Sequence, residues 1–357
     1  MPTVSIVIPT YNRSDLLKVA LISCLEQTYR DFEVIVVDDG STDDTKQMVE
    51  SLNSEKVQYI YQENCGRSKA RNNGIAQARG KYITFLDSDD IYLPQKLAVQ
   101  VKTLDQNPAF GMVYSSAFNV DIDGKIHPYV YPATASGNIY KEIALYLPLT
   151  ICLPTVMARR EVFEKVGVFD ERQNRFEDTD MWRRISKQYK ILAIEEPLCK
   201  IRYHEGNEME HPDKIFKALK YYTEKVLRED TLRYGFHLRF LAAHLCAHYG
   251  LAVHNHVNPA YQQYSHHFIR LAFKYSPLWC LRRGLTYYLD KKTAAPILGL
   301  MRIRRGILRM LELAKVQNAS RRKYARFDAL FWHHIRIRPA SPAQTAMKPK
   351  ECVDSKR

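Results

Sequence analysis

The chain has 357 residues, of which 46% are hydrophobic, and a formal net charge of +14. Its length is enough for one large domain and a second, smaller one, and no apolar run approaches the roughly 18 residues that a membrane span needs. The seven cysteines are scattered and include no Cys-x-x-Cys pair, which argues against a disulfide framework or a zinc ribbon and for reduced thiols.

The charge is unevenly distributed along the chain. Residues 215–357 contain 27 Lys and Arg against 8 Asp and Glu, whereas residues 1–214 contain 26 against 31. A basic C-terminal half of this kind suits an anionic surface, either lipid head groups or nucleic acid. The N-terminus lacks a basic and then apolar signal segment. We therefore expect a cytoplasmic protein, with a peripheral position on the inner face of the cytoplasmic membrane if it meets a membrane.

Three apolar runs, at residues 4–8, 32–37 and 82–86, open the predicted fold. Continuous apolar runs indicate strands that are buried on both faces of a sheet. Each run ends in a polar segment, at residues 9–13, 38–43 and 87–90 respectively. Because parallel sheets bind ligands at the carboxyl ends of their strands, these segments predict a nucleotide pocket.

The predicted elements between these runs complete an alternating α/β pattern with right-handed crossovers. Helical periodicity covers residues 16–25, 44–53, 67–79 and 93–104, and two further strands are predicted at 57–60 and 112–116. Ser14 is a candidate N-cap of the first helix, and Ser41 or Thr42 of the second. Residues 119–150 are rich in Pro, Gly, Tyr and Thr and have no sustained period, so we expect loops around an acceptor cleft. Helices are predicted again at 160–166 and 178–189.

From Pro212 onward the pattern is almost continuously helical. Apolar residues recur at spacings of three and four in segments 214–230, 236–254, 258–275, 277–290 and 294–316, which predicts stacked antiparallel helices. Residues 297–311 form a basic amphipathic pattern, typical either of a membrane-surface helix or of a packed helix with solvated arginines. We assign 214–334 to a basic helical domain. Residues 335–357 contain three prolines and few apolar residues and are expected to be a disordered tail.

Six motifs, taken in order, resemble the family 2 glycosyltransferases, which have the inverting GT-A fold. They are residues 9–13, 36–43, 66–72 with Gly74, 85–90, 166–171 and 176–182. No single motif is specific, but their order and spacing are. The resemblance covers about residues 2–205. It implies a GT-A type, Rossmann-like mixed sheet flanked by helices over residues 1–213, with a nucleotide-sugar half at 1–105 and an acceptor half at 106–213.

Asp87 and Asp89 follow directly after a predicted strand. Clustered carboxylates repel one another unless a cation compensates them, and few carboxylates together with substrate phosphates are typical ligands of Mg²⁺ or Mn²⁺. The alternative is a solvated turn or helix cap. The resemblance implies direct metal contact for Asp89, a position nearer the ribose for Asp87, and a place for His204 close to the metal or diphosphate.

The resemblance also implies a set of nucleotide-sugar contacts. Asp39 would accept the imide N–H of a uracil base, Tyr11 would stack on the base, and Arg71 would lie near the nucleotide, one helical turn from Arg67. Tyr11 could instead be an ordinary surface tyrosine, and Arg67 could be solvated. The residues expected to bind the nucleotide-sugar are Pro9, Thr10, Tyr11, Asn12, Arg13, Asp39, Arg67, Arg71, Asp87 and Ser88.

Asp178 is the candidate general base, because an inverting transferase needs one carboxylate within hydrogen-bond reach of the acceptor hydroxyl. A position at a helix start would lower the pKa of its carboxyl, so we expect the bound, water-poor complex to restore basicity. An acidic helix cap is the structural alternative. Glu177 and Trp182 are candidates for the acceptor side, although a lone tryptophan also fits core packing.

Together these features predict an inverting, metal-dependent glycosyltransferase. The donor would be a UDP-sugar, such as a UDP-hexose or UDP-N-acetylhexosamine, and the acceptor a saccharide hydroxyl of a surface glycan such as a lipopolysaccharide, held on a lipid. One alternative is a sugar-phosphate nucleotidyltransferase, which would usually have a Gly-rich basic loop after the first strand, where residues 9–12 stand here. Another is a nucleic-acid-binding protein led by the basic half, although we expect no nucleic-acid partner.

Overall fold

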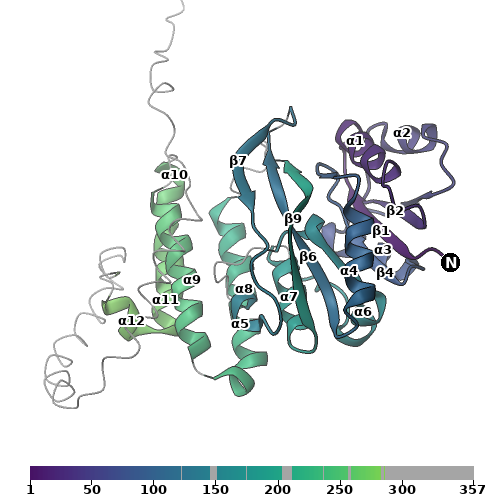
Figure 1. Cartoon of the computed structure of the whole chain (residues 1–357). Coiled ribbons are helices and arrows are strands. Elements are labelled where there is room, and N and C mark those ends of the chain that lie inside the picture. Colours follow the sequence, from purple (N-terminus) through teal and green to yellow (C-terminus); the bar gives the residue numbers. More distant parts are fainter. Residues whose placement is uncertain are drawn as a thin grey trace, which may run out of the picture.

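A computed structural model describes residues 1–121, 123–144, 151–173, 175–202, 211–235, 237–255, 259–282 and 285. Its described part has an α/β region built on one curved sheet, and a set of helices that stands beside this region (Figure 1). The sequence predicted both parts, because long buried-strand patterns occur early in the chain and helical periodicity occurs late.

The first half of the sheet is parallel. β1 (Val4–Thr10) lies between β2 (Phe32–Asp38) and β4 (Tyr82–Phe85), and β3 (Val57–Tyr61) extends the sheet beyond β2. Every residue of β1 and β2 is buried, as expected for strands covered on both faces. The register sets Thr10 beside Asp38, so the ends of neighbouring strands meet at one edge.

The second half makes the sheet mixed. β8 (Val156–Arg159) lies antiparallel between β4 and β6 (Phe110–Val120), and β9 (Lys190–Arg202) runs parallel to β6. The order is β3-β2-β1-β4-β8-β6-β9-β5, in which β5 (Ile91–Tyr92) forms the edge and β7 (Ile126–Tyr131) pairs with β6 off this path. A short 3₁₀ helix, Leu153–Thr155, leads into β8.

One sequence prediction for this half needs correction, and one strand was missed. Residues 119–150 are not only loops: β7 forms a hairpin with β6, and α5 (Tyr140–Ile143) follows. Strand β9 was not predicted, because Glu195, Glu196 and Pro197 interrupt its apolar pattern. The structure accommodates this interruption with an irregular register opposite Ser115 and Ser116.

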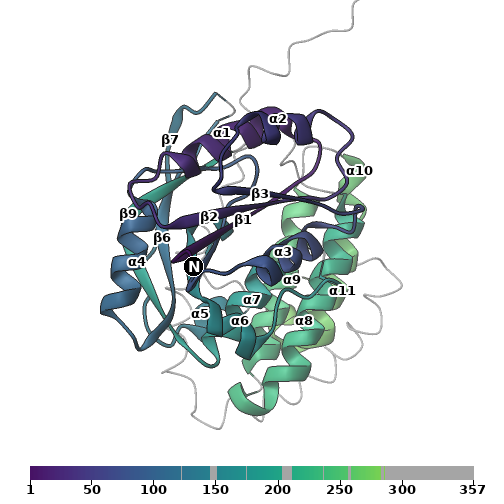
Figure 2. The ribbon, with the colours of Figure 1, turned by 90° about the vertical axis from the view of Figure 1, so that its right-hand side faces the viewer.

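Helices cover both faces of the sheet. Figure 2 shows α1 (Ser14–Leu25) and α2 (Thr45–Ser51) on one side of the first strands and α3 (Arg67–Gln77) on the other. Alternate residues of β1 divide accordingly: Ile6 and Ile8 belong to the core under α1, and Val7 to the core under α3, as the period of a strand requires. A Cβ atom on Gly74 would lie 2.3 Å from Val7 Cγ1, so glycine permits the close approach of α3.

The predicted N-caps are wrong. Ser14 is the first residue of α1, and α2 begins only at Thr45. Asp43 serves both helix starts instead. Its Oδ2 accepts the Ser14 N–H at 3.2 Å, and its Oδ1 accepts the Thr45 N–H at 3.1 Å. One carboxylate thus satisfies amide groups that begin two helices.

Three further helices complete the α/β region: α4 (Lys96–Gln106), α6 (Arg160–Val166) and α7 (Glu177–Ser186). The helical region then comprises α8 (Pro212–Tyr234), α9 (His237–His254), α10 (Pro259–Gln262), α11 (Ser265–Tyr275) and α12 (Pro277–Arg282). Its hydrophobic core also contains Tyr140 and Phe176 from the α/β region. The two regions therefore share a core, although the sequence separates them near residue 213.

The predicted helix at 294–316 and the tail at 335–357 lie outside the described residues. Much of the basic excess lies there too, since residues 286–357 contain 17 Lys and Arg against five Asp and Glu. In the part of the chain that the structure describes, we find no helix with the length and apolar character needed to cross a bilayer.

Candidate active site

The two aspartates at the end of β2 have different roles. Asp38, the last residue of the strand, accepts the Ser41 N–H at 2.8 Å and the Tyr59 hydroxyl proton at 2.6 Å. It therefore shapes the turn. Asp39, the residue after the strand, instead contacts the segment that precedes α3.

Asp39 is buried and accepts three hydrogen bonds. They come from Gln62 Nε2 at 2.7 Å, Cys65 N at 2.9 Å and Gly66 N at 2.8 Å. A carboxylate offers about four acceptor directions, so one remains for a ligand N–H. The turn beside it requires Gly40, which has a φ of 88° and whose added Cβ would lie 2.9 Å from Asn64 N.

The loop after β1 is attached to the loop after β2. Asn12 Oδ1 accepts the Thr42 N–H at 2.7 Å, and the Asn12 N–H donates to Ser41 Oγ at 2.8 Å. Tyr11 is 48% exposed at the tip, so part of its surface is accessible to a ligand. Pro9 is buried within β1, and thus it shapes the tip and presents no side-chain surface to a nucleotide.

One polar atom at this tip has no partner. Thr10 is 3% exposed, and its Oγ1 makes no hydrogen bond within the described residues. The Thr10 carbonyl accepts the Asp39 N–H at 2.9 Å. The predicted β1 contacts and Asp39 therefore lie at one edge of the sheet.

The third tip holds the carboxylate cluster. Asp89 Oδ2 lies 2.6 Å from Arg13 Nη1, which brings the β1 and β4 ends together. Asp90 is buried and accepts the Arg202 N–H at 2.8 Å, while Arg202 Nε donates to the Asp89 carbonyl at 2.9 Å. Burial, and then the charges of Asp89 and Asp87, raise the pKa of Asp90 well above its ordinary value. Ser88 between them is buried.

This cluster has the chemistry of a divalent cation site. Asp87, whose side chain is 33% exposed, and Asp89 offer hard oxygen ligands, and their charges already oppose ionisation of Asp90. Within the described residues no group of three or more His, Cys, Asp or Glu side chains could hold a metal by itself. The donor set thus fits an ion shared with substrate phosphates, which is usual for Mg²⁺. His204 lies outside the described residues.

Arg71 joins this cluster to the helix that carries the candidate base. Its side chain is buried, with Nη2 2.8 Å from Asp87 Oδ1 and Nη1 2.9 Å from Glu177 Oε1. Arg67 is half exposed, 3.8 Å from the same Glu177 oxygen. Arg71 is therefore a buried bridge beside Asp87, and its expected place near the nucleotide stays a prediction. Glu177 is likewise buried and engaged, and the sequence did not indicate this pairing.

Asp178 follows Glu177 in the first turn of α7 and is partly buried. Burial, and then the neighbouring charge of Glu177, raise the pKa of its carboxyl to about 6. The Thr179 N–H, which donates to Asp178 Oδ1 at 2.6 Å, and the charge of Arg71 oppose the rise. The helix start had predicted a lowered pKa, but desolvation outweighs the dipole here.

Trp182 is not an acceptor contact. Only 1% of its surface is exposed, its Nε1–H donates to the Ile151 carbonyl at 3.1 Å, and its ring packs edge-on against Phe169. This burial leaves no face for a sugar, so the expectation for Trp182 is corrected to a core position on the buried face of α7.

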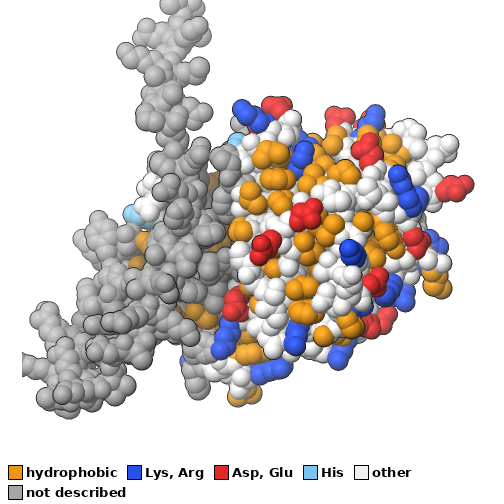
Figure 3. Space-filling view, in the orientation of Figure 1, with side chains coloured by type: hydrophobic (Ala, Val, Ile, Leu, Met, Phe, Trp, Pro, Cys, Tyr) orange, Lys and Arg blue, Asp and Glu red, His pale blue; other side chains and the backbone are white. Residues whose placement is uncertain are grey.

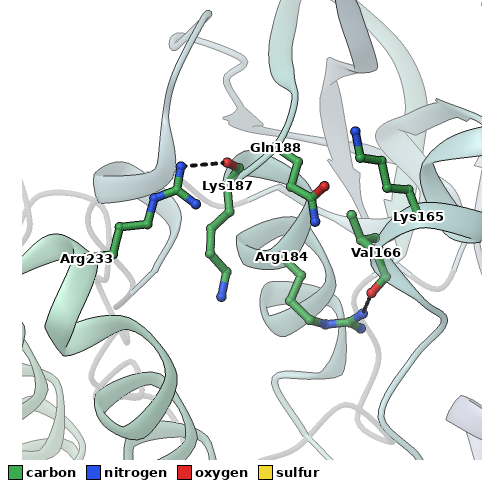
Figure 4. A pocket seen from close by; sticks show the side chains of 6 residues that line it. All are labelled: Lys165, Val166, Arg184, Lys187, Gln188 and Arg233. Atoms are coloured by element: carbon green, nitrogen blue, oxygen red, sulfur yellow. Dashed lines mark hydrogen bonds between the residues drawn. The ribbon is translucent and has the colours of Figure 1, made fainter.

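A hollow of about 650 Å³ lies at the opposite end of α7 (Figure 4). Its lining is Lys165, Val166, Arg184, Lys187, Gln188 and Arg233. Arg184 Nη1 donates to the Val166 carbonyl at 2.7 Å, and Arg233 Nη2 to the Lys187 carbonyl at 3.3 Å. These cations lie at the carbonyl ends of α6 and α7, where positive charge is favourable. The hollow is therefore separate from the carboxylate cluster.

Comparison with known proteins identifies the family of the chain. Residues 5–167 match the model of the family described as Glycosyl transferase family 2. An uncharacterized glycosyltransferase of Methanocaldococcus jannaschii is 33% identical over 233 residues, which are 63% of this chain and 79% of that protein. One of Rickettsia felis is 35% identical over 231 residues, or 64% of this chain and 38% of the relative. The chain thus spans little more than a third of the length of that Rickettsia relative.

Solved structures show the same fold. The crystal structure of S. aureus TarS superposes with a TM-score of 0.59 at 19% sequence identity, covering 83% of this chain and 86% of the TarS chain. The TarS structure in complex with UDP-GlcNAc gives a TM-score of 0.60, at 77% and 80% coverage. These likenesses confirm the predicted GT-A type α/β fold. With the M. jannaschii relative matched over most of its length, the chain belongs to glycosyl transferase family 2.

Proposed function

We propose that this protein is an inverting glycosyltransferase that moves a sugar from a nucleotide-sugar to a saccharide hydroxyl. Family membership supports glycosyl transfer. The observation that carries the proposal is the bridge from Asp87 through Arg71 to Glu177, beside Asp178 with its pKa of about 6. This bridge joins a cluster suited to a diphosphate to a carboxylate suited to proton removal.

The donor would bind across the tips of β1 and β2. The remaining acceptor direction of Asp39 suits the imide N–H of uracil, the exposed ring of Tyr11 suits base stacking, and the unpaired Thr10 Oγ1 offers one further polar contact. The complex of TarS with UDP-GlcNAc supports a uridine diphosphate donor. Arg13, next to Asp89, is placed to meet the diphosphate.

Asp89 and Asp87 would hold the divalent cation, Mn²⁺ or Mg²⁺, and the bound ion would neutralise negative charge on the leaving diphosphate. Arg13 adds positive charge next to the same carboxylates. Arg71 donates to Asp87 Oδ1 at 2.8 Å and would fix the orientation of that carboxylate.

Asp178 would take the proton of the acceptor hydroxyl. The hydroxyl oxygen attacks the anomeric carbon as the bond from that carbon to the diphosphate oxygen breaks, so the configuration inverts in a single displacement. With a pKa of about 6, roughly nine-tenths of the Asp178 carboxyls are ionised at pH 7, and the group is still basic enough to accept a proton. We propose that the acceptor is a lipid-linked intermediate of a surface glycan. The basic C-terminal residues would hold the enzyme near the membrane that carries this acceptor.

No specific observation favours the alternatives. Figure 3 shows Lys and Arg interspersed with Asp and Glu on the visible face of the α/β region, which offers nucleic acid no continuous basic track on that face. A nucleotidyltransferase has no use for a base such as Asp178.

The test is release of nucleotide from a panel of nucleotide-sugars with saccharide acceptors. We expect Asp178→Asn to lower kcat by about 10²- to 10⁴-fold and to leave the donor KM nearly unchanged. Asp105→Asn is the matched control, because Asp105 contacts Lys81 and Tyr82 at the start of β4, whereas Asp87 and Asp89 follow the end of that strand. Wild-type turnover by Asp178→Asn would refute the assignment of the base.

A further inference from the structure

A buried ionic network fastens α7 to α8. Lys225 of α8 donates to Asp170 Oδ2 at 2.8 Å and to Asp180 Oδ2 at 2.9 Å. Arg183 of α7, which is fully buried, lies 2.7 Å from Asp180 Oδ1 and 2.7 Å from Glu229 Oε2, and it also contacts Asp230. Each cation therefore bridges carboxylates from different segments of the chain.

The start of α7 is held by aromatic contacts from the same helices. Phe176, which directly precedes Glu177, has a φ of 63° and is 5% exposed. Its ring stacks on Tyr222 of α8 at 5.7 Å and meets Tyr249 of α9 edge-on at 5.9 Å. A left-handed backbone is unfavourable for a residue with a Cβ, so these contacts sustain the conformation from which Glu177 and Asp178 project.

The charge of Asp178 also affects the pKa of side chains in the helical region. Burial raises the pKa of Tyr249 to about 12, with Arg175 opposing and the charge of Asp178 adding to the rise. Tyr222 shows the same effect, with burial as the main cause. On the α/β side, Glu177, Arg71 and Cys152 interact with the same carboxylate. Tyr222 of α8 and Tyr249 of α9 therefore lie within electrostatic range of Asp178.

We infer that α8 and α9 belong to the catalytic apparatus, and that Phe176, Lys225 and Arg183 are positioning residues that hold Asp178 against the donor site. This inference rests on the proposed function in one respect, the role of Asp178 as base. Two sets of contacts, which together we call the clamp, hold α7: the ring contacts of Phe176 at its start, and the ion pairs of Lys225 and Arg183 along its length. All three residues lie beyond residue 167, where the family match ends. The clamp leaves Asp178 little freedom relative to Asp87, because Arg71 also joins Asp87 to Glu177.

Ion pairs serve positioning better than an apolar contact of equal size. Buried ion pairs give little net stability relative to well-packed apolar groups, but their hydrogen bonds have fixed directions. Lys225 of α8 can donate to Asp170 and Asp180 at the same time only in one position of α7 relative to α8. A small displacement of a reacting group lowers the rate strongly.

The experiment compares Lys225→Met and Phe176→Leu with the control Lys274→Met in the full chain. Lys274 pairs with Glu224 of α8 at 2.9 Å, but it is 61% exposed and belongs to α11. We expect the two test variants to lower kcat about tenfold or more and to leave the donor KM within twofold. As Asp178 gains solvent, the acidic limb of the kcat profile should move to lower pH. Lys225→Arg should recover part of kcat, and Lys274→Met should match wild type.

Amide hydrogen exchange of residues 177–186 supplies a readout that does not depend on turnover. Faster exchange in Lys225→Met and Phe176→Leu, but not in Lys274→Met, is the expected result. Unchanged exchange in the folded test variants, or faster exchange with unchanged kcat, would overturn the inference. If Lys225→Met does not fold, Phe176→Leu alone decides. If Asp178→Asn retains full activity, the base assignment fails, and the exchange result still shows whether the clamp exists.

Discussion

The donor side and the base side of this site are built from different kinds of structure. The donor side consists of loops at the ends of β1, β2 and β4, which the register of a parallel sheet brings together. The base side is the first turn of α7, held by α8 and α9 through buried ion pairs and ring contacts. A sheet edge thus positions one set of groups with backbone hydrogen bonds, whereas the other set depends on side chains far apart in sequence.

The largest effect expected on the donor side comes from loss of the divalent ion. Asp89→Ala, or removal of divalent ions by a chelator, should lower turnover about a hundredfold or more, because charge on the leaving diphosphate is then less well compensated. Mn²⁺ should restore the chelated wild type but not the variant. The measurement is nucleotide release before and after metal is added back. Full turnover in the metal-free wild type would show that Arg13 and other cations suffice.

Arg71→Met cuts the connection between the two sides. Asp87 and Glu177 then lose a buried cation that lies 2.8 Å and 2.9 Å from them. We expect a loss of about 3–5 kcal/mol in the free energy of unfolding, typical of one broken buried pair, and a fall in kcat of about tenfold or more. Urea unfolding and steady-state kinetics measure the two effects.

The control for Arg71 is Arg160→Met. Arg160 is 44% exposed and pairs with Glu164, which is 68% exposed, at 3.7 Å, so its removal should change stability by about 0–1 kcal/mol. An equal loss in the free energy of unfolding in both variants would show that the buried bridge stabilises the protein no more than an exposed ion pair does.

The same comparison shows what the sequence predicted and what it did not. The tips of β1, β2 and β4 were found because apolar runs mark buried strands, and the ends of parallel strands share an edge. The pairing of Arg71 with Glu177 spans 106 residues, and no local pattern indicates it. Trp182 was ambiguous because a tryptophan can serve a core or a sugar equally well, and only its burial decides.

Asp178→Asn should also change stability, in a direction set by pH. The pKa of this carboxyl rises from 3.8 to about 6 in the folded protein, so the folded state binds its proton more tightly than the unfolded chain between about pH 4 and 6. Stability therefore falls as pH increases through that window. Asparagine cannot ionise, so the variant should gain about 1–3 kcal/mol at pH 7.5.

Near pH 3.5 the wild-type carboxyl is protonated in the folded state and mostly protonated in the unfolded chain, so the same substitution should have little effect on stability. Thermal unfolding at the two pH values measures the difference. A variant that is less stable than wild type at pH 7.5 would show that the ionised carboxylate stabilises the fold, contrary to the desolvation that raises its pKa.

The smallest expected effect lies at the tip of β1, where Tyr11 is 48% exposed. If its ring stacks on the donor base, Tyr11→Ala should raise the donor KM by about 5- to 10-fold, which is the lower end of the roughly 1–3 kcal/mol that base–aromatic stacking is worth by alanine substitution, because Tyr11 is half exposed. Because the acceptor hydroxyl meets a different part of the site, kcat should remain within twofold. Tyr11→Phe keeps the ring and should behave as wild type. Equal KM values for the alanine and phenylalanine variants would leave Asp39 and Thr10 as the residues that recognise the base.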